Sequence, residues 1–327
     1  MIQELQNKIS QEIERLSAEF SIPPSELYEP IRYTLSLGGK RVRPLLVLFG
    51  CDLFMGKAEE AVPAALAIEL FHTFTLVHDD IMDNAPLRRN QPTVHQKWNA
   101  STAILSGDVM LVKAYGLIGK SKMCNAILPV FSEMAEKVCE GQQWDLNYEK
   151  LDKISVPQYF KMIELKTAVL IAASLKIGAI IGGAAAEDAK HLYEFGKNTG
   201  LAFQLQDDLL DVYGEEEKFG KQKGGDIISN KKTFLLLKAV ELSSLNGYKK
   251  EELAQWLNFH PKNEKESKEK VEAVKAIYDF TNVKKITETE IQSLHQKAIH
   301  SIEKVSAPAE KKKLLIDFTS SLLKREA

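Results

Sequence analysis

The sequence is poor in cysteine, and its charges nearly cancel. Its three cysteines, Cys51, Cys124 and Cys139, lie far apart with no C-x-x-C spacing, so neither a zinc site nor a disulfide framework is expected. The formal net charge of -2 argues against a nucleic-acid binder, because such proteins usually carry a basic surface. We therefore expect a reduced, cytoplasmic protein without a nucleic-acid partner.

Long uninterrupted apolar runs are also absent. The most apolar stretch, residues 169–186, is broken by Lys176 and three glycines, so a buried helix is expected there rather than a membrane span. Residues 1–16 follow an amphipathic, charged pattern and do not resemble a secretory signal peptide. The sequence therefore predicts no membrane span.

Alternating strand patterns and flexible linkers are missing as well. Apolar residues recur with a period near 3.6 in almost every segment, which indicates helices. No stretch rich in glycine, serine or proline divides the chain. We predict one all-α domain over residues 1–327, a bundle of ten or more helices around a central apolar cavity. The expected helices are 2–20, 25–37, 44–55, 59–83, 100–118, 122–147, 156–183, 187–213 and 228–244, with a polar loop over 84–99 and several smaller outer helices over about 249–325.

Two acidic motifs of the form D-D-x-x-D occur, at residues 79–83 and 207–211. If aspartate is about one residue in twenty, the pattern arises by chance about once per 8,000 positions, so two copies indicate a function. On a helix, the first and last aspartates lie about 6 Å apart on one face, where Mg²⁺ would relieve their repulsion. Solvated acidic helix ends would give the same pattern, but the apolar neighbours argue for buried surroundings.

Cations gather at chain interruptions near these motifs. Residues 38–44 form a glycine turn followed by Lys40, Arg41 and Arg43, a pattern typical of an anion site beside a helix start. The other basic groups are Arg88, Arg89, Lys166, Lys221, Lys223, Lys231 and Lys232. No G-x-x-x-x-G-K-[ST] loop is present, so a P-loop nucleotide enzyme is not expected. The pattern predicts a diphosphate-bearing ligand, chelated by Mg²⁺ through aspartates and bound by lysine and arginine, with an apolar remainder.

With these motifs the sequence resembles the trans-isoprenyl diphosphate synthases, or polyprenyl synthetases, over about residues 37–233. The matching motifs are G-G-K-R-x-R-P at 38–44, D-D-x-x-D at 79–83 with R-R at 88–89, G-Q-x-x-D at 141–145, K-T at 166–167, F-Q-x-x-D-D-x-x-D at 203–211, and G-K-x-x-G-x-D at 220–226 with Lys231 after it. The resemblance implies the all-α isoprenoid synthase fold, usually as a homodimer, with both acidic motifs facing one cavity. It implies transfer of a prenyl group from an allylic diphosphate (dimethylallyl, geranyl or farnesyl) to isopentenyl diphosphate.

The resemblance also implies roles for individual residues. The Mg²⁺ ligands would be Asp79, Asp83 and Asp207, with Asp80, Asp208 and Asp211 in support; three Mg²⁺ per site are implied, and Mn²⁺ is an alternative. The isopentenyl diphosphate site would contain Lys40, Arg43, His72 and Arg89. The allylic diphosphate site would contain Arg88, Lys166, Thr167, Gln204, Lys221 and Lys231. Catalysis is expected to depend most on Asp79, Asp83, Asp207, Lys166 and Arg88.

The chemistry fits these residues. Mg²⁺ and the cations would stabilise the departing diphosphate, and an allylic carbocation would form in an apolar pocket that excludes water. The isopentenyl double bond would attack it, and the released diphosphate would take the proton. One departure from the family pattern is Asn90, where glycine is usual. If that position needs a positive φ, asparagine is the next most tolerant residue, so we expect slight strain and retained activity.

Residues upstream of the first motif are candidates for setting product length. Thr75 lies about 6 Å and Phe71 about 12 Å below Asp79 along a helix, whereas Phe74 lies about 140° round it. In the resembling family, an aromatic residue five positions before the first aspartate accompanies C15 to C20 products. Phe74 with Thr75 therefore indicates geranylgeranyl diphosphate, with farnesyl diphosphate or products of C25 and above as alternatives. Phe74 as an ordinary core residue is the competing interpretation.

Two other functions remain open. A class I terpene cyclase would share the fold and the first motif, but those enzymes usually carry a different metal motif at positions such as 207–211. They also lack the second diphosphate site of Lys40 and Arg43. A non-catalytic regulatory subunit would usually have lost one acidic motif, and both are present here.

Overall fold

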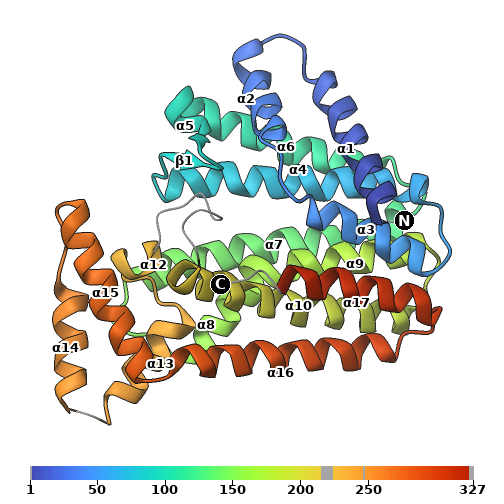
Figure 1. Cartoon of the computed structure of the whole chain (residues 1–327). Helices are drawn as coiled ribbons and strands as arrows, with labels where there is room; N and C mark the ends of the chain where they lie inside the picture. Colours follow the sequence, from blue (N-terminus) through green and yellow to red (C-terminus); the bar gives the residue numbers. More distant parts are fainter. Residues whose placement is uncertain (1, 215–223, 246, 324–327) are drawn as a thin grey trace. The chain divides into compact units, whose positions relative to one another are not determined.

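The chain is helical almost throughout, as the periodicity of its sequence predicts (Figure 1). The structure is a computed structural model that describes residues 2–214, 224–245 and 247–323. Its helices are α1 (Ile2–Glu19), α2 (Ser25–Ser36), α3 (Val42–Leu53), α4 (Ala58–Met82), α5 (Val94–Lys97), α6 (Ala100–Gly119), α7 (Cys124–Glu149), α8 (Val156–Ile163), the π-helical turn η1 (Glu164–Ala168), α9 (Val169–Ile181), α10 (Ala186–Tyr213), α12 (Gly225–Ile228), α13 (Phe234–Ser243), α14 (Gly247–Asn258), α15 (Glu264–Phe280), α16 (Val283–Glu303) and α17 (Ala309–Leu323). The all-α prediction with ten or more helices is confirmed.

The chain divides into two compact units. Unit 1 comprises Met1–Ala135, Leu170–Gly196 and Ser301–Leu315, and unit 2 comprises Glu136–Val169, Lys197–His300 and Ile316–Ala327. A single domain over 1–327 with one central apolar cavity stays a prediction.

Helix α4 is the central element of unit 1, packed against α3 and α6 (Figure 1). Its alanine-, leucine- and isoleucine-rich sequence favours helix and is largely buried. Glu59 and Glu60 lie in its first turn, where carboxylates interact favourably with the positive end of the helix dipole.

The end of α4 is fixed by a Schellman motif at the first acidic motif. Asp83 is the C-cap, and Asn84 follows it with φ +49°. The amide of Ala85 donates to the carbonyl of Asp80 (2.9 Å), and that of Asn84 donates to the carbonyl of Ile81 (3.2 Å). The first motif therefore occupies the last turn of α4, as the sequence predicts.

A small hairpin occupies part of the predicted polar loop over 84–99. Its strands β1 (Leu87–Arg88) and β2 (Gln91–Pro92) are antiparallel, with Arg88 opposite Gln91. Arg89 and Asn90 form the two-residue turn with φ values of +54° and +60°. Two successive positive φ angles are typical of a type I′ turn, which favours asparagine and glycine. Asn90 thus meets the condition that the sequence analysis set for it; its retained activity stays a prediction.

Unit 2 departs from the expected helices in two places. The helix expected over 156–183 begins as predicted at Val156, after the N-cap Ser155, whose side chain forms a capping box with Gln158. The π-helical turn η1 then interrupts it. The helix expected over 228–244 is shorter, because Thr233 caps the start of α13 with its side chain accepting from the amide of Leu236. The short helix α12 precedes that start.

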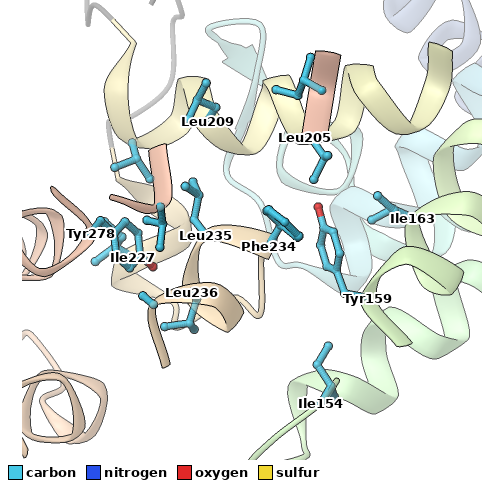
Figure 2. Packing of buried hydrophobic residues seen from close by; sticks show 14 of the residues in the cluster. Ile154, Tyr159, Ile163, Leu205, Leu209, Ile227, Phe234, Leu235, Leu236 and Tyr278 are labelled. Atoms are coloured by element: carbon cyan, nitrogen blue, oxygen red, sulfur yellow. The ribbon is translucent and has the colours of Figure 1, made fainter. Parts of the chain in front are cut away.

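The core of unit 2 gathers residues far apart in sequence (Figure 2). Tyr159 and Phe234 lie among Leu205 and Leu209 of α10. Tyr278 of α15 also joins them, together with Ile277, Ile291 and Leu294 from the C-terminal helices. The tail forms several helices as expected, but the expectation that they lie on the outside was wrong for α15 and α16, whose apolar residues complete this core.

Two described helices, α4 and α6, are long and apolar enough to cross a membrane by length and composition alone. Of the apolar window in each, 67% is buried in α4 and 39% in α6. The run at 169–186, which the sequence analysis singled out, is not one of them. Buried core helices meet the same criterion, so the expectation of no membrane span stays a prediction.

Candidate active site

The first acidic motif holds its middle aspartate inside unit 1. Asp80 is buried, and the Nε atom of Arg88 lies 2.9 Å from both of its carboxylate oxygens, with Nη2 2.7 Å from Oδ1. Burial raises the pKa of Asp80, although the guanidinium of Arg88 opposes that shift. Successive residues are turned by about 100° on a helix. Asp79 and Asp83 therefore share a face that Asp80 does not.

The donors of this face suit a hard divalent cation. Asp79 and Asp83 offer carboxylate oxygens one helical turn apart, and carboxylates are the ligands that Mg²⁺ prefers. Within residues 2–214, 224–245 and 247–323, no three His, Cys, Asp or Glu side chains are grouped so as to hold a metal ion. Mg²⁺ is usually bound by one or two carboxylates plus substrate phosphates, so this donor set fits a metal that binds with a diphosphate.

Several predicted ligands of isopentenyl diphosphate lie together in unit 1. Arg43 Nη1 donates to His72 Nε2 (3.1 Å), and arginine cannot accept, so this ring nitrogen carries no proton. Burial and the guanidinium of Arg43 lower the pKa of His72 well below its ordinary value. Arg89 donates to the carbonyl of Gly38. Lys40 is exposed on the same turn.

Gly39 leaves room for the side chain of Arg89. Its φ of +125° is one that other residues rarely adopt, and an added Cβ would lie 2.6 Å from Arg89 Nη2. The absence of a side chain at Gly39 therefore leaves the space that the guanidinium of Arg89 occupies. Arg89 also lines a pocket, together with residues of α2 and α4, Arg41 and the hairpin that carries Arg88.

The second acidic motif also holds its middle aspartate by hydrogen bonds. Asp208 is buried; the hydroxyl of Tyr159 donates to its Oδ2, and Gln204 Nε2 donates to its Oδ1 (2.9 Å). Thr167 Oγ1 in turn donates to Gln204 Oε1 (3.0 Å). Burial and the nearby carboxylate of Asp226 raise the pKa of Asp208. Figure 2 shows the hydroxyl of Tyr159 directed toward α10.

The last aspartate of this motif binds the segment that carries Lys231. The carbonyl of Asp211 accepts from the amide of Gly224 (2.8 Å), and its Oδ2 accepts from the amide of Asp226 (3.0 Å). Lys231 Nζ lies 3.8 Å from Asp226 Oδ1. Lys221, the other lysine predicted here, lies outside the described residues.

Lys166 and Thr167 occupy the π-helical turn η1. Such turns are rare and often occur at functional sites. Lys166 Nζ lies 2.6 Å from Asp145 Oδ2 on α7. Gly141, one turn earlier on α7, lets the two backbones meet, since an added Cβ would lie 2.6 Å from Leu165 C and Lys166 Cα. The G-Q-x-x-D motif therefore supports η1 and its lysine.

The candidate chain-length residues lie one or two turns before Asp79. Phe74 is buried, with ring centroids 5.5 Å from Phe71 and 4.8 Å from His78. Thr75 is partly exposed, and its hydroxyl donates to the carbonyl of His72 (2.8 Å). Phe74 thus belongs to an aromatic cluster on the side of α4 that the helical wheel alone does not select.

Sequence reasoning missed three side chains that hold this site. Glu69 gave the clearest signal, since it is one carboxylate in an otherwise apolar run of α4. Asp145 stood in a recognised motif without a role. Tyr159 gave none, because it is 49 residues from Asp208. The catalytic and binding roles of the predicted residues stay predictions.

Comparison with known proteins places this chain among characterised enzymes. The polyprenyl synthetase family model matches residues 24–277. The geranylgeranyl diphosphate synthase of Methanosarcina mazei is 40% identical over 222 residues, which cover 67% of this chain and 68% of the relative. A solved geranylgeranyl pyrophosphate synthase is 43% identical, with a TM-score of 0.94 and coverage of 100% of this chain and 99% of its own.

A more distant structure was solved with its ligands. The geranylgeranyl pyrophosphate synthase of Corynebacterium glutamicum, complexed with isoprenyl diphosphate and magnesium, is 25% identical, with a TM-score of 0.86 and coverage of 99% of this chain and 98% of its own. Relatives also include geranylfarnesyl diphosphate synthases. The chain therefore belongs to the polyprenyl synthetase family and is a polyprenyl diphosphate synthase, a trans-prenyltransferase of isoprenoid biosynthesis.

Proposed function

We propose that this enzyme condenses isopentenyl diphosphate with an allylic diphosphate to give geranylgeranyl diphosphate. The observation that carries the product length is Phe74, which is buried in an aromatic cluster five residues before Asp79. The names of several relatives support the same product. Geranylfarnesyl diphosphate synthases among the relatives make a C25 product the second candidate, and farnesyl diphosphate the third.

We propose that the two diphosphates are bound by separate sets of cations. Arg88, Lys166, Thr167, Gln204, Lys221 and Lys231 would bind the allylic diphosphate. Lys40, Arg43, His72 and Arg89 would bind isopentenyl diphosphate, with His72 neutral as its hydrogen bond to Arg43 requires. Buried apolar side chains such as Phe71 and Phe74 would exclude water while the isopentenyl double bond attacks the allylic carbon. The released diphosphate would take the proton.

Asp79, Asp83 and Asp207 would bind Mg²⁺, with Asp80, Asp208 and Asp211 in support. Bound Mg²⁺ would neutralise charge on the departing diphosphate. Support for this comes from the carboxylate donors on α4 and from the magnesium in the Corynebacterium glutamicum structure. Three Mg²⁺ per site, with Mn²⁺ as a substitute, complete the proposal.

A homodimer in the cytoplasm is also proposed. One side of α6 exposes apolar residues that a second copy would cover: Leu105 is 56% exposed and Val112 is 70% exposed. Ile104 lies beside them, also exposed. An apolar face of this kind is typical of interfaces between subunits.

One assay tests the reaction and its alternatives. The purified chain is incubated with isopentenyl diphosphate, Mg²⁺ and each allylic primer in turn, and the products are separated by chain length. A linear C20 diphosphate is the expected product. A linear C25 product would support the second candidate, and a product that stops at C15 would support the third.

The length assignment predicts that Phe74→Ala lengthens the product beyond C20. Removing the ring opens space beside Phe71, two turns from Asp79, for further prenyl units. Product analysis with farnesyl diphosphate as primer measures this shift. Phe280→Ala, at a residue that is 59% exposed, is the control and should not change the product. Unchanged lengths in Phe74→Ala would mean that Phe74 is an ordinary core residue.

A further inference from the structure

The three cations of residues 38–44 point to different partners. Lys40 is exposed, and Arg43 donates to His72. The side chain of Arg41 is only 11% exposed; its guanidinium forms an ion pair with Glu69 and donates to the carbonyl of Leu35. Arg41 therefore joins α2 and α4 at the start of α3, while the cations on either side of it belong to the proposed diphosphate site.

The backbone of this turn adopts conformations that need support from side-chain contacts. Arg41 is the N-cap of α3 with φ +46° and ψ +38°, and its side chain does not cap the helix. Gly38 and Gly39 also have positive φ angles. A non-glycine residue in this region is strained and persists only where the surrounding structure holds it. The contacts of Arg41 to Glu69 and Leu35 supply that constraint.

The burial and position of Glu69 suit it to hold Arg41. Its side chain is 5% exposed, so its carboxylate needs a cation beside it. It lies one helical turn before His72 on α4. Helix α4 therefore fixes the position of the turn through two contacts, that of Arg41 with Glu69 and that of Arg43 with His72.

We propose that the Arg41–Glu69 ion pair is a positioning pair that holds the turn of residues 38–43 so that Lys40 and Arg43 meet isopentenyl diphosphate. This inference rests on the proposed roles of Lys40 and Arg43. The alternative is that Arg41 contacts the diphosphate itself. The two interpretations differ in the effect expected from removing the charge of Glu69. A positioning pair needs this carboxylate, so affinity for isopentenyl diphosphate should fall. If Arg41 instead bound the diphosphate, removing the carboxylate would free Arg41 for that contact, and affinity should not fall.

The test is a double-mutant cycle on the full-length enzyme, with Arg41→Met, Glu69→Gln and both together. KM is measured separately for isopentenyl diphosphate and for the allylic primer, along with kcat. Each single variant should raise the KM for isopentenyl diphosphate about tenfold or more, with the allylic KM and kcat changed less than about threefold. The double variant should show about the same tenfold rise in this KM and not the product of the two single rises, because both changes remove the same ion pair.

Controls separate this inference from the proposed function. Arg41→Lys keeps the ion pair and should restore most of the affinity. Arg32→Met, at an exposed cation of α2, should change neither KM. Arg43→Ala tests the proposed site: if it leaves the KM for isopentenyl diphosphate unchanged, the site assignment fails, whatever the cycle shows.

Three results would overturn the inference while Arg43→Ala behaves as expected. They are an unchanged or lower KM for isopentenyl diphosphate in Glu69→Gln, multiplicative effects in the double variant, or an equal rise in both KM values. If the single variants do not fold, the double variant decides the matter, because it leaves no buried charge unpaired. A rise in its KM for isopentenyl diphosphate alone supports the pair, and no rise contradicts it.

Discussion

Replacing Asp79 or Asp207 with alanine should lower kcat by about 10³-fold while the protein stays folded. Each change removes a carboxylate proposed to bind Mg²⁺, and with it charge stabilisation of the leaving diphosphate. Neither residue is buried as Asp80 and Asp208 are, so the loss of packing should be small. The measurement is kcat at saturating Mg²⁺ and both substrates, with the midpoint of thermal unfolding recorded for each variant.

A matched control makes this result specific to the motifs. Asp152→Ala removes an exposed aspartate of unit 2 and should leave kcat unchanged. Turnover close to the parent level in Asp79→Ala or Asp207→Ala would contradict the metal assignment. A collapse of the unfolding midpoint in either would mean that the residue is structural.

Replacing Gly141 with alanine should lower both stability and activity, although Gly141 is not proposed to contact a substrate. The new Cβ would lie 2.6 Å from Leu165 C and Lys166 Cα, so α7 and the π-helical turn would have to separate. Overpacking of this kind costs about 1–3 kcal/mol of folding free energy. It would also move Lys166 away from Asp145, which it now meets at 2.6 Å.

The expected kinetic result of Gly141→Ala is a fall of about 100-fold in kcat/KM for the allylic diphosphate. Steady-state kinetics and the unfolding midpoint check the two effects. Gly119→Ala is the control, because an added Cβ there meets nothing within 4 Å. That change should be neutral or slightly stabilising. Full activity in Gly141→Ala would show that the packing of η1 against α7 does not determine the function of Lys166.

The sequence was most informative where one short motif indicates both a function and a helix end. The acidic motifs lie at the C-terminal ends of α4 and α10, and the turn residue Asn84 marks where α4 stops. The apolar period near 3.6 predicts most of the helices, because the apolar residues of each helix recur on its buried face. For the π-helical turn the sequence gives only a weak signal, because Lys166 and Thr167 are polar residues within an otherwise apolar stretch.

What the sequence could not supply were choices made by tertiary contacts. Lys40, Arg41 and Arg43 look equivalent in the sequence. In the structure, however, Arg41 turns inward to Glu69 and Arg43 contacts His72. Tyr159 reaches Asp208 only because α8 and α10 pack together, a contact no local spacing encodes. The apolar residues of α15 and α16 likewise become core through packing that their charged neighbours concealed.

The hydrogen bonds of the two middle aspartates have a consequence for substrate affinity. Asp80 immobilises Arg88, and Asp208 with Thr167 immobilises Gln204, before any ligand arrives. Ordering a side chain of this kind during association costs about 0.5–1.5 kcal/mol each. For Arg88 and Gln204 that loss of rotamer entropy occurs on folding, so these two proposed ligands of the allylic diphosphate are preorganised. More of the binding free energy then remains to stabilise the transition state.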